Sequence, residues 1–433
     1  MTVETTVLSN GITVATQHFG HVESVATGVW VKAGTRNEKT DEHGLAHMLE
    51  HMAFKGTRTR SALGIAEAIE NVGGDINAAT SVETTSFFVR VLKDDTELAI
   101  DILADILQNS AFDQDELERE KHVVLQELGA ANDTPDDAVF DRFTETVFRH
   151  QAVGRAILGT RDTISSFTPD MLRNYITREY CGDRMVVAAT GAVDHDAFVK
   201  LVEAKFSGIA KTCSGGKPSS ANYVGGDYRE ARDLQDVQLL FGFEGRAYHV
   251  RDYYCSQVLA MLLGGGMSSR LFQEVREKRG LCYSIYAFHW GFSDTGVFGL
   301  HAATEPNDIP ELVSTIIGEL KRIAGDVRDS ELQRARAQFR ASLLMSGESA
   351  ASRAGQIARQ ILLFGRPVDQ SELLARIDAI DVDRVQDLSG RLFGGSRPTV
   401  SAIGPVENLI GIDEFRDELR SPMAGADKQF AVA

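Results

Sequence analysis

Cysteine is scarce in this sequence of 433 residues, which holds four cysteines and no C-x-x-C pair. Cys181, Cys213, Cys255 and Cys282 are scattered along the chain, and such spacing is not typical of a disulfide framework. We therefore expect reduced thiols, most of them buried, in a cytosolic setting.

Long apolar runs and targeting segments are missing as well. No stretch approaches the roughly eighteen unbroken apolar residues of a transmembrane helix, so we expect no contact with a membrane. The first residues, MTVETTVLSNGITVATQ, lack the basic and apolar regions of a secretory signal and the Arg-rich amphipathic helix of a mitochondrial one. These absences predict a cytoplasmic location.

Positive charge is in short supply. The chain has 45 lysines and arginines against 62 aspartates and glutamates, a formal net charge of −17 and a sequence pI near 5.1. This balance argues against nucleic acid as a partner and would favour a cationic substrate. At 433 residues the chain is also too long for one small core, so we expect at least two domains.

A stretch rich in serine and glycine divides the chain near its midpoint. Residues 212–226, TCSGGKPSSANYVGG, show little apolar periodicity and are predicted to form a linker. The domains on either side, residues 1–211 and 227–433, share a similar order of strand-like and helix-like patterns, with matched elements roughly 210 residues apart. We predict an α+β fold of two homologous halves, each an antiparallel sheet with helices packed on one face.

Residues 43–57, HGLAHMLEHMAFKGT, contain the string H-x-x-E-H, which is the metalloprotease motif H-E-x-x-H reversed. His47 and His51 are four residues apart, so a helix places both imidazoles on one face, as a zinc site requires. Glu50 lies near the same face and could take a proton from an attacking water molecule. We expect Asp41 to cap this helix. The alternative is a partly exposed helix with two ordinary histidines, because chance alone yields the string in roughly a few per cent of chains.

Two protein ligands do not complete a zinc site, and a second helical segment offers more. In DQDELEREKHVVLQELGAA, which begins at Asp113, Glu120 and Glu127 are seven residues apart and share one helical face. The apolar residues around Glu127 predict its burial, and a buried carboxylate needs a partner such as a metal. The alternative is a solvated carboxylate on an amphipathic helix. His122 faces elsewhere on this helix, and His43 is expected to be a capping or surface residue.

These two segments, which place Glu127 76 residues after His51, resemble the pitrilysin/insulinase family of inverted-motif zinc peptidases. Within the family, the likeness is to the catalytic beta subunit of mitochondrial processing peptidase and its bacterial single-chain homologues, and it extends over essentially the whole chain. The resemblance implies one zinc ion per chain, with His47, His51 and Glu127 as its ligands. It makes Glu50 the general base and Glu120 an auxiliary acidic residue that orients a ligand.

A segment of the second half suggests a substrate clamp. Residues 262–288, LLGGGMSSRLFQEVREKRGLCYSIYAF, resemble the family segment that carries an arginine and a tyrosine seven positions apart, here Arg276 and Tyr283. A guanidinium and a hydroxyl can hold the substrate backbone and the oxyanion of a tetrahedral intermediate. Alternatively, Arg276 is one of several surface charges and Tyr283 is a core aromatic residue. The positions that match the metal motif are Leu and Val residues near 259–263, so we expect this half to be metal-free.

Two further pairs of residues are candidates for substrate binding. Asn77 and Ala78 lie in a strand-like segment, and the family binds extended peptides along the edge of such a strand, although an ordinary paired strand is the alternative. Asp137 and Asp141 share a helical face and resemble the acidic pair with which processing peptidases read an arginine near the cleavage site. The first residue of that pair is commonly glutamate, so the shorter Asp137 leaves the depth of the pocket open. The alternative is a solvated acidic face.

The predicted function is that of a zinc endopeptidase for extended or short peptides, with a preference for a basic residue near the cut. We expect a homodimer, because a second chain would supply the four-domain chamber of the family and bring Arg276 and Tyr283 to the zinc of its partner. A heterodimer with a related subunit is the other possibility. The competing function is that of a non-catalytic assembly or scaffold subunit, a kind of family member that typically has a degraded metal motif. A bacterial cytoplasm is the expected location.

Overall fold

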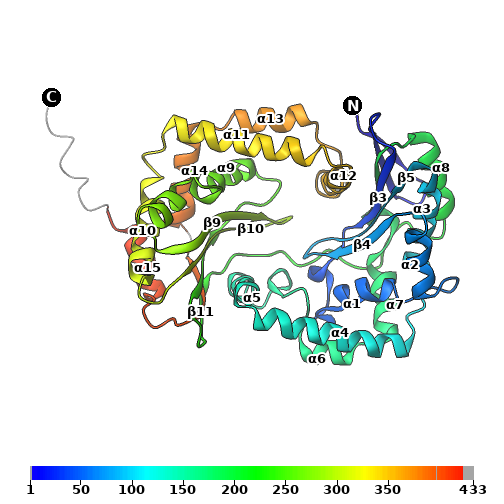
Figure 1. The fold of residues 1–433 in the computed structure, drawn as a ribbon, viewed down its shortest axis with the longest axis horizontal. Coiled ribbons are helices and arrows are strands. Elements are labelled where there is room, and N and C mark those ends of the chain that lie inside the picture. Colours follow the sequence, from blue (N-terminus) through cyan, green and yellow to red (C-terminus); the bar gives the residue numbers. More distant parts are fainter. Residues whose placement is uncertain (1, 396, 423–433) are drawn as a thin grey trace. The chain divides into compact units, whose positions relative to one another are not determined.

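The computed structural model describes residues 2–395 and 397–422, which form two compact units (Figure 1). The first unit combines the described residues up to Ala130 with Arg155–Ser219 and Leu343–Asp369. The second unit combines Ala131–Gly154, Ser220–Ser342 and the described residues from Gln370 onward. The two units are therefore interleaved along the chain.

The first unit is built on a six-stranded sheet with the order β1-β2-β6-β3-β5-β4. Its strands are β1 (Glu4–Val7), β2 (Thr13–His18), β3 (Ser24–Val31), β4 (Asp75–Thr80), β5 (Thr85–Leu92) and β6 (Met185–Gly191). Neighbouring strands run antiparallel except β2 and β6, which are parallel. The central strands β3 and β6 are apolar and almost wholly buried, as expected for strands that are covered on both faces.

The helices of the first unit cover both faces of this sheet. They are α1 (Leu45–Ala53), α2 (Ala62–Glu70), α3 (Thr96–Gln108), most of α4 (Gln114–Asp133), α6 (Arg161–Ser166), α7 (Pro169–Glu179), α8 (His195–Lys205) and α12 (Ala350–Phe364). Side chains alternate along β6, so that Val187 faces the main core whereas Val186 faces α12. On that second face, Ile357 of α12 joins Trp30 and Val186 in a small apolar cluster.

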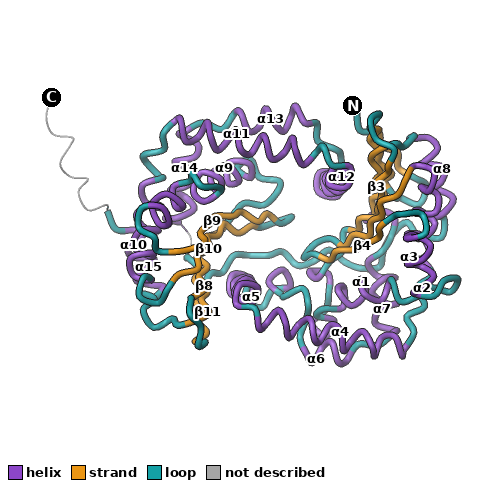
Figure 2. Tube along the Cα trace, viewed as in Figure 1, coloured by secondary structure: helices purple, strands orange, loops and turns teal. Residues whose placement is uncertain are grey.

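The second unit contains a five-stranded sheet with the order β7-β11-β8-β10-β9, in which only β7 and β11 are parallel among the described pairings. Its strands are β7 (Gly226–Ala231), β8 (Val237–Glu244), β9 (Cys282–Gly291), β10 (Gly296–Thr304) and β11 (Thr399–Gly404). Figure 2 shows β9, the edge strand, beside β10. Within the two described ranges, no helix is both long enough and apolar enough to span a membrane.

The helices of the second unit include one from the N-terminal half of the chain. They are α5 (Pro135–Val147), α9 (Tyr253–Gly264), the π-helix η6 (Phe272–Glu277), α10 (Ile309–Arg322), most of α11 (Asp329–Ser346), α13 (Gln370–Asp378), α14 (Val382–Gly395) and α15 (Ile412–Arg420). Helix α5 packs on β8 and β11 of the second sheet, whereas α12, from the C-terminal half, packs on β3 and β6 of the first. The predicted α+β class with two related halves is confirmed. The expectation of purely antiparallel sheets with helices on one face is wrong, because each sheet contains one parallel pair and α12 covers the second face of the first sheet. Each half also gives one helix to the other, which the sequence did not predict.

The expectation that all four cysteines are reduced is wrong. Cys181 and Cys213, 32 residues apart in sequence, form a disulfide with their Cα atoms 5.3 Å apart. Cys181 lies in the turn between α7 and β6, and Cys213 follows α8, so the fold brings together two positions whose spacing predicts no pairing. Cys255 and Cys282 are free and buried, as expected.

Candidate metal centre

Helix α1 carries the three motif residues within about one and a half turns. His47 is buried, whereas Glu50 and His51 are partly exposed, and the two imidazole rings lie with their centroids 4.7 Å apart. Because these residues are three and four positions apart, they project from one face of α1. The expected juxtaposition of the histidines is therefore present in the fold.

The start of α1 differs from the prediction. Asp41 is exposed in a separate 3₁₀ turn, η2 (Thr40–Glu42), and the helix begins after Gly44. Gly44 has φ of 91°, and a Cβ there would lie 2.6 Å from the carbonyl oxygen of Leu158, so a residue with a side chain does not fit. The carboxylate of Glu38 accepts hydrogen bonds from the backbone N–H groups of Gly44 (3.0 Å) and Ala46 (2.8 Å). Glu38 therefore satisfies the N-terminus of the helix in place of Asp41.

Helix α4 brings Glu127 to the two histidines. Glu127 Oε1 lies 3.7 Å from His47 Nε2, and Glu127 Oε2 lies 3.6 Å from His51 Nε2. Both distances exceed ordinary hydrogen bonds, and all three donor groups lie within 4.8 Å of one another. Metal–ligand bonds of about 2 Å separate the donors of a tetrahedral site by a little over 3 Å, so the spacing fits a shared cation.

The predicted burial of Glu127 is wrong, because its side chain is 45% exposed. Of its apolar neighbours on α4, Val124 is buried but Val123 is exposed. Convergence with the histidines is what singles out Glu127. Zinc accepts a donor set of two imidazole nitrogens and one carboxylate oxygen. Because the Glu127 side chain is partly exposed, a further ligand could reach the metal.

Glu120 is the buried carboxylate of α4. Its Oε2 lies 3.0 Å from His51 Nδ1 and its Oε1 lies 2.5 Å from Lys55 Nζ. Burial raises the pKa of Glu120, but the bonds from Lys55 and His51 outweigh burial and hold the pKa below its ordinary value. An ionised Glu120 accepts a hydrogen bond from Nδ1–H of His51, a tautomer that leaves the Nε2 lone pair facing Glu127.

His47 is suited to act as a neutral ligand. Burial, and to a smaller extent the neighbouring His51, lower the pKa of His47 to about 4. A metal binds the neutral imidazole, and a pKa this low keeps the ring neutral at ordinary pH, so that one of its two nitrogens carries no proton. The Nδ1 atom of His47 is buried and has no hydrogen-bond partner within the described part of the chain.

Strand β4 lies at the edge of the first sheet and contains Asn77 and Ala78. Among the described strands it pairs with β5 alone, and it packs against α1, where Thr80 Oγ1 donates a 3.4 Å hydrogen bond to the Ala46 carbonyl. An edge strand leaves one row of backbone groups available for another chain. At this edge the Ala78 N–H already donates to Asn77 Oδ1 (2.8 Å), so a peptide added beside α1 would replace that bond.

Arg276 and Tyr283 belong to the second unit and lie beside each other. Arg276 is on the π-helix η6, and its guanidinium carbon lies 4.7 Å from the ring centroid of Phe272 and 5.3 Å from that of Tyr283. Tyr283 is 84% exposed, so the alternative that it is a core aromatic residue is wrong. π-Helices occur frequently at functional sites, and here η6 presents an arginine stacked on an open tyrosine.

Asp137 and Asp141 are on α5, also in the second unit. Asp137 is exposed and Asp141 is partly buried. Burial, followed by the nearby Glu145 and Asp137, raises the pKa of Asp141 to about 6, against the opposing effect of Arg142. The negative charges of Asp137 and Asp141 therefore repel each other, and a bound cationic group would reduce this repulsion.

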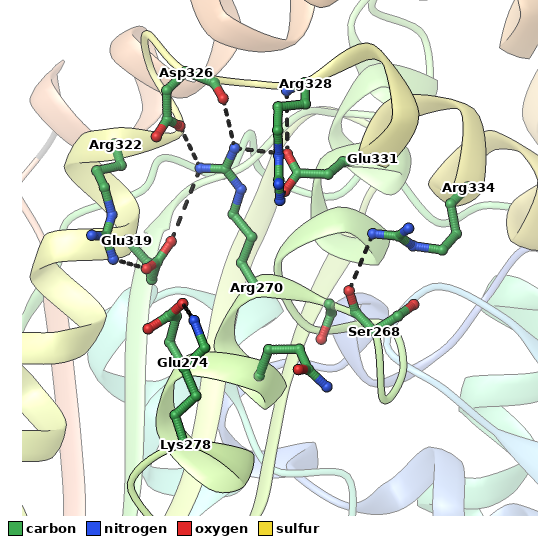
Figure 3. Close-up of a pocket in the computed structure, with 12 residues that line it drawn as sticks. Ser268, Arg270, Glu274, Lys278, Glu319, Arg322, Asp326, Arg328, Glu331 and Arg334 are labelled. Carbon is green, nitrogen blue, oxygen red and sulfur yellow. Dashed lines mark hydrogen bonds and ion pairs between the residues drawn. The ribbon is translucent and has the colours of Figure 1, made fainter.

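A cavity of about 790 Å³ lies in the second unit and is lined by charged side chains (Figure 3). At its centre, Arg270 is bonded to Asp326 (2.6 Å) and Glu331 (2.8 Å). Its wall includes Glu274, on η6, and Lys278, which directly follows η6, so that Arg276 lies between them in sequence. These ion pairs brace the helix that carries Arg276, and the cavity lining contains none of the residues that the sequence singles out.

Sequence reasoning missed two supporting residues of the metal centre. Lys55 lies two residues after the end of α1, where helical spacing gives no face, so its contact with Glu120 depends on how the chain turns after the helix. Glu38 precedes α1 and gives no periodic signal, because its role depends on how the chain turns before the helix.

The fold is that of a two-sheet α+β protein, and its first unit contains a cluster of donor groups that could hold a metal ion. Residues 13–161 match a family model described as "Insulinase (Peptidase family M16)", and residues 166–339 match one described as "Peptidase M16 inactive domain". The chain belongs to the insulinase family of peptidases, M16. The resemblance that the sequence motifs suggested is confirmed.

Relatives are similar over most of the chain. A protein of Rickettsia bellii named "Uncharacterized zinc protease" is 39% identical over 407 residues, covering 93% of this chain and 98% of its own. A probable mitochondrial-processing peptidase subunit beta of Arabidopsis thaliana is 36% identical over 425 residues, covering 95% and 80% respectively. Among solved structures, a protease from Helicobacter pylori has a TM-score of 0.87 at 22% identity, covering 93% and 99%, which shows the shared fold.

Proposed function

We propose that this chain is a zinc-dependent endopeptidase that cleaves extended or short peptides. The observation that carries the proposal is the convergence of His47, His51 and Glu127 within 4.8 Å, next to Glu50 on the same helix. Membership of a peptidase family, and relatives that are named zinc proteases, support it.

Each residue of the centre has a role in hydrolysis. Held by His47, His51 and Glu127, a zinc ion supplies Lewis acidity toward a peptide carbonyl and a water molecule. Glu50 accepts a proton from the attacking water and later delivers it to the leaving amine. Glu120 keeps the His51 ring oriented through its 3.0 Å contact with Nδ1.

The substrate is proposed to bind as an added strand. The free edge of β4, at Asn77 and Ala78, offers backbone groups to an extended peptide, while Arg276 and Tyr283 hold the substrate carbonyl and the developing oxyanion. The acidic pair Asp137 and Asp141 adds a preference for a basic residue near the cut.

A homodimer is the proposed assembly, in which Arg276 and Tyr283 of one chain serve the zinc of the other. The relatives named beta subunits of processing peptidase make a heterodimer with a related subunit the second possibility. We also propose that the protein works in a bacterial cytoplasm, as a partner of peptides and not of nucleic acid or membranes.

Metal analysis combined with a quenched-fluorescent peptide tests the proposal. We expect one zinc per chain and cleavage that a chelator abolishes. Glu50→Gln should retain the zinc and lower kcat/KM by about 100-fold or more, because a general base is removed while the ligands stay in place. Glu67→Gln, an exposed change on α2, is the matched control and should change neither quantity.

The alternative function is that of a non-catalytic assembly subunit. It has the support of a shared fold with a chain of "Complex III2 from Candida albicans" (TM-score 0.84, 21% identity). A zinc-loaded chain that cleaves no member of a peptide library, or one whose cleavage survives Glu50→Gln, would favour this alternative over the peptidase.

A further inference from the structure

The disulfide between Cys181 and Cys213 fastens two separate segments of the first unit. Cys181 is 1% exposed and stands between α7 and the 3₁₀ turn η5 (Gly182–Arg184), whereas Cys213 is partly exposed at the start of the glycine-rich stretch after α8. Cys213 is therefore the more accessible of the two cysteines, whereas Cys181 is enclosed by the fold.

The stretch fastened by Cys213 lies against charged residues of α7 and η5. The backbone N–H of Gly215 donates to the Arg178 carbonyl (2.9 Å), and Arg184 Nη2 donates to the Gly215 carbonyl (2.6 Å). A Cβ on Gly215 would lie 2.6 Å from both the Arg178 carbonyl oxygen and Glu179 Oε1. The backbone of this stretch is thus pressed against Arg178, Glu179 and Arg184.

Hydrogen bonds link the same residues to the segment that leads into α1. Glu179 is buried and accepts hydrogen bonds from Arg184 (2.5 Å), Arg178 (2.9 Å) and Asn37 (2.9 Å). Arg178 also makes two bonds to the buried carboxylate of Glu42, at 2.8 and 2.6 Å. Asn37 and Glu42 lie eight and three residues before the first residue of α1, so this buried network joins the fastened stretch to the segment that leads into α1. If one charged residue of this network moves away, its ion-pair partner keeps a buried and uncompensated charge, which destabilises the remaining ion pairs.

We propose that the Cys181–Cys213 bond is a redox modification site, which dithiol reductants open, and that its reduction loosens the network behind α1 and weakens metal retention. The last step rests on the proposed zinc site, whereas the loosening of the lead-in to α1 does not. A disulfide in a protein of a reducing compartment is typically a labile or sensing one.

The chemistry balances with a dithiol as the electron donor. Its thiolate attacks Cys213 Sγ, which forms a mixed disulfide and releases Cys181 as a thiolate that takes up a proton. The second thiol of the donor then displaces Cys213 and closes the donor's own disulfide, so two electrons and two protons reach the cysteines. Asp183 Oδ1, 2.8 Å from Cys181 Sγ, is already placed to accept a hydrogen bond from the new thiol.

The other two cysteines do not compete for this role. Burial raises the pKa of Cys255 to about 12 and that of Cys282 to about 11. Both remain protonated and enclosed at ordinary pH, so they react slowly with thiol reagents in the native protein. As free thiols they also offer a reductant no bond to open, so in the described part of the chain a reductant acts on the Cys181–Cys213 bond.

Thiol counting, limited trypsin digestion and zinc release, each measured before and after treatment with a phosphine reductant, test the proposal on the full chain. The unfolded protein should titrate two thiols before reduction and four after it. Reduction should speed cleavage at Lys39, in the lead-in to α1, by several-fold relative to Lys93, another exposed lysine of the first unit. Zinc transfer to a chromophoric chelator should accelerate by several-fold, and Tm should fall by roughly 5–10 °C.

The double variant Cys181→Ser/Cys213→Ser is the matched control. It should behave as the reduced chain does and should not respond to the phosphine. This comparison separates the effect of opening the disulfide from any direct effect of the reagent on zinc. Unchanged cleavage at Lys39 after complete reduction would overturn the proposal, and so would an equal response in the double variant. Four free thiols with a second bound metal in the untreated protein would instead assign Cys181, Asp183 and Cys213 to a metal site. A chain that binds no zinc would refute the proposed function but not the role of the disulfide, because the digestion rates and Tm still test that role.

Discussion

The Oε2 atom of Glu120 lies 3.0 Å from Nδ1 of His51, while Nε2 of the same ring faces Glu127 at 3.6 Å. One imidazole is therefore held between two carboxylates of α4, a buried one that fixes its orientation and a half-exposed one with which it can share a metal. Lys55 neutralises Glu120 from the other side at 2.5 Å, so the buried charge is compensated without the metal.

Removing this support should weaken zinc binding without removing a ligand. We expect Glu120→Ala to lower zinc affinity by about 10–100-fold, because His51 loses the group that sets its tautomer and ring orientation. Glu120→Gln keeps an acceptor oxygen, so its zinc affinity should lie between that of the wild type and that of Glu120→Ala. Competition with a chromophoric chelator measures both. Glu116→Gln, which alters an ion pair with Arg119 on the exposed side of α4, is the control, and equal zinc affinity in all the variants would show that Glu120 has no such role.

The helix exchange predicts that stability of the first unit depends on residues late in the chain. Ile357 of α12 is fully buried on the face of β3 and β6, so Ile357→Ala should lower the free energy of unfolding of this unit by about 2–5 kcal/mol. Leu344→Ala, at a leucine that is 36% exposed, should change it far less. Denaturant unfolding of both variants makes the comparison.

A truncated chain tests the same dependence more severely. A fragment of residues 1–211 lacks α12 and leaves α5 without its sheet, since α5 packs on β8 and β11. We expect this fragment to aggregate or to unfold without a cooperative transition. A fragment that unfolds cooperatively with wild-type stability would mean that α12 is dispensable for the first unit.

What the sequence predicted and what it missed have different physical origins. The pairing of His47 with His51 follows from helix geometry alone, and the choice of Glu127 follows from a resemblance, so both were accessible without coordinates. The cap by Glu38 and the bond between Cys181 and Cys213 depend on how loops return to distant elements, which no local pattern encodes. The packing of α12 on the first sheet was missed because its apolar face looks the same whichever sheet it covers.

Asp141 should make stability depend on pH in a defined direction. Its folded pKa of about 6 exceeds the unfolded value of 3.8, so the native state favours the protonated carboxyl. The contribution of protonated Asp141 to the free energy of unfolding is complete below about pH 4, and it is lost as the pH rises through about 6. Asp141→Asn should therefore raise the free energy of unfolding at pH 7.5, by no more than about 3 kcal/mol, and change it little at pH 4.

The same carboxyl should tune substrate choice if it reads a basic residue. A bound arginine favours ionised Asp141, so the preference for an arginine peptide over its norleucine analogue should rise about tenfold between pH 5 and pH 7. Taking the ratio of kcat/KM for the two peptides cancels titrations at the metal centre. Asp141→Asn should flatten the ratio. A ratio that is independent of pH in the wild type would assign Asp137 and Asp141 to a solvated acidic face.

Mixed dimers test whether Arg276 and Tyr283 serve a neighbouring chain. A His51→Ala chain has a damaged metal site and an intact clamp, whereas a Tyr283→Phe chain has the reverse. If the clamp acts between chains, a dimer of one chain of each kind contains one complete site, and mixing after dissociation should restore up to about half of the wild-type activity per mixed dimer, since one of two sites is whole. If the clamp acts within a chain, the same dimer contains no complete site and activity stays at the level of the parents. Native mass spectrometry of the mixture establishes that mixed dimers formed, and a mixture of His51→Ala with His47→Ala, which lacks an intact metal site in either chain, must remain inactive for recovery to count.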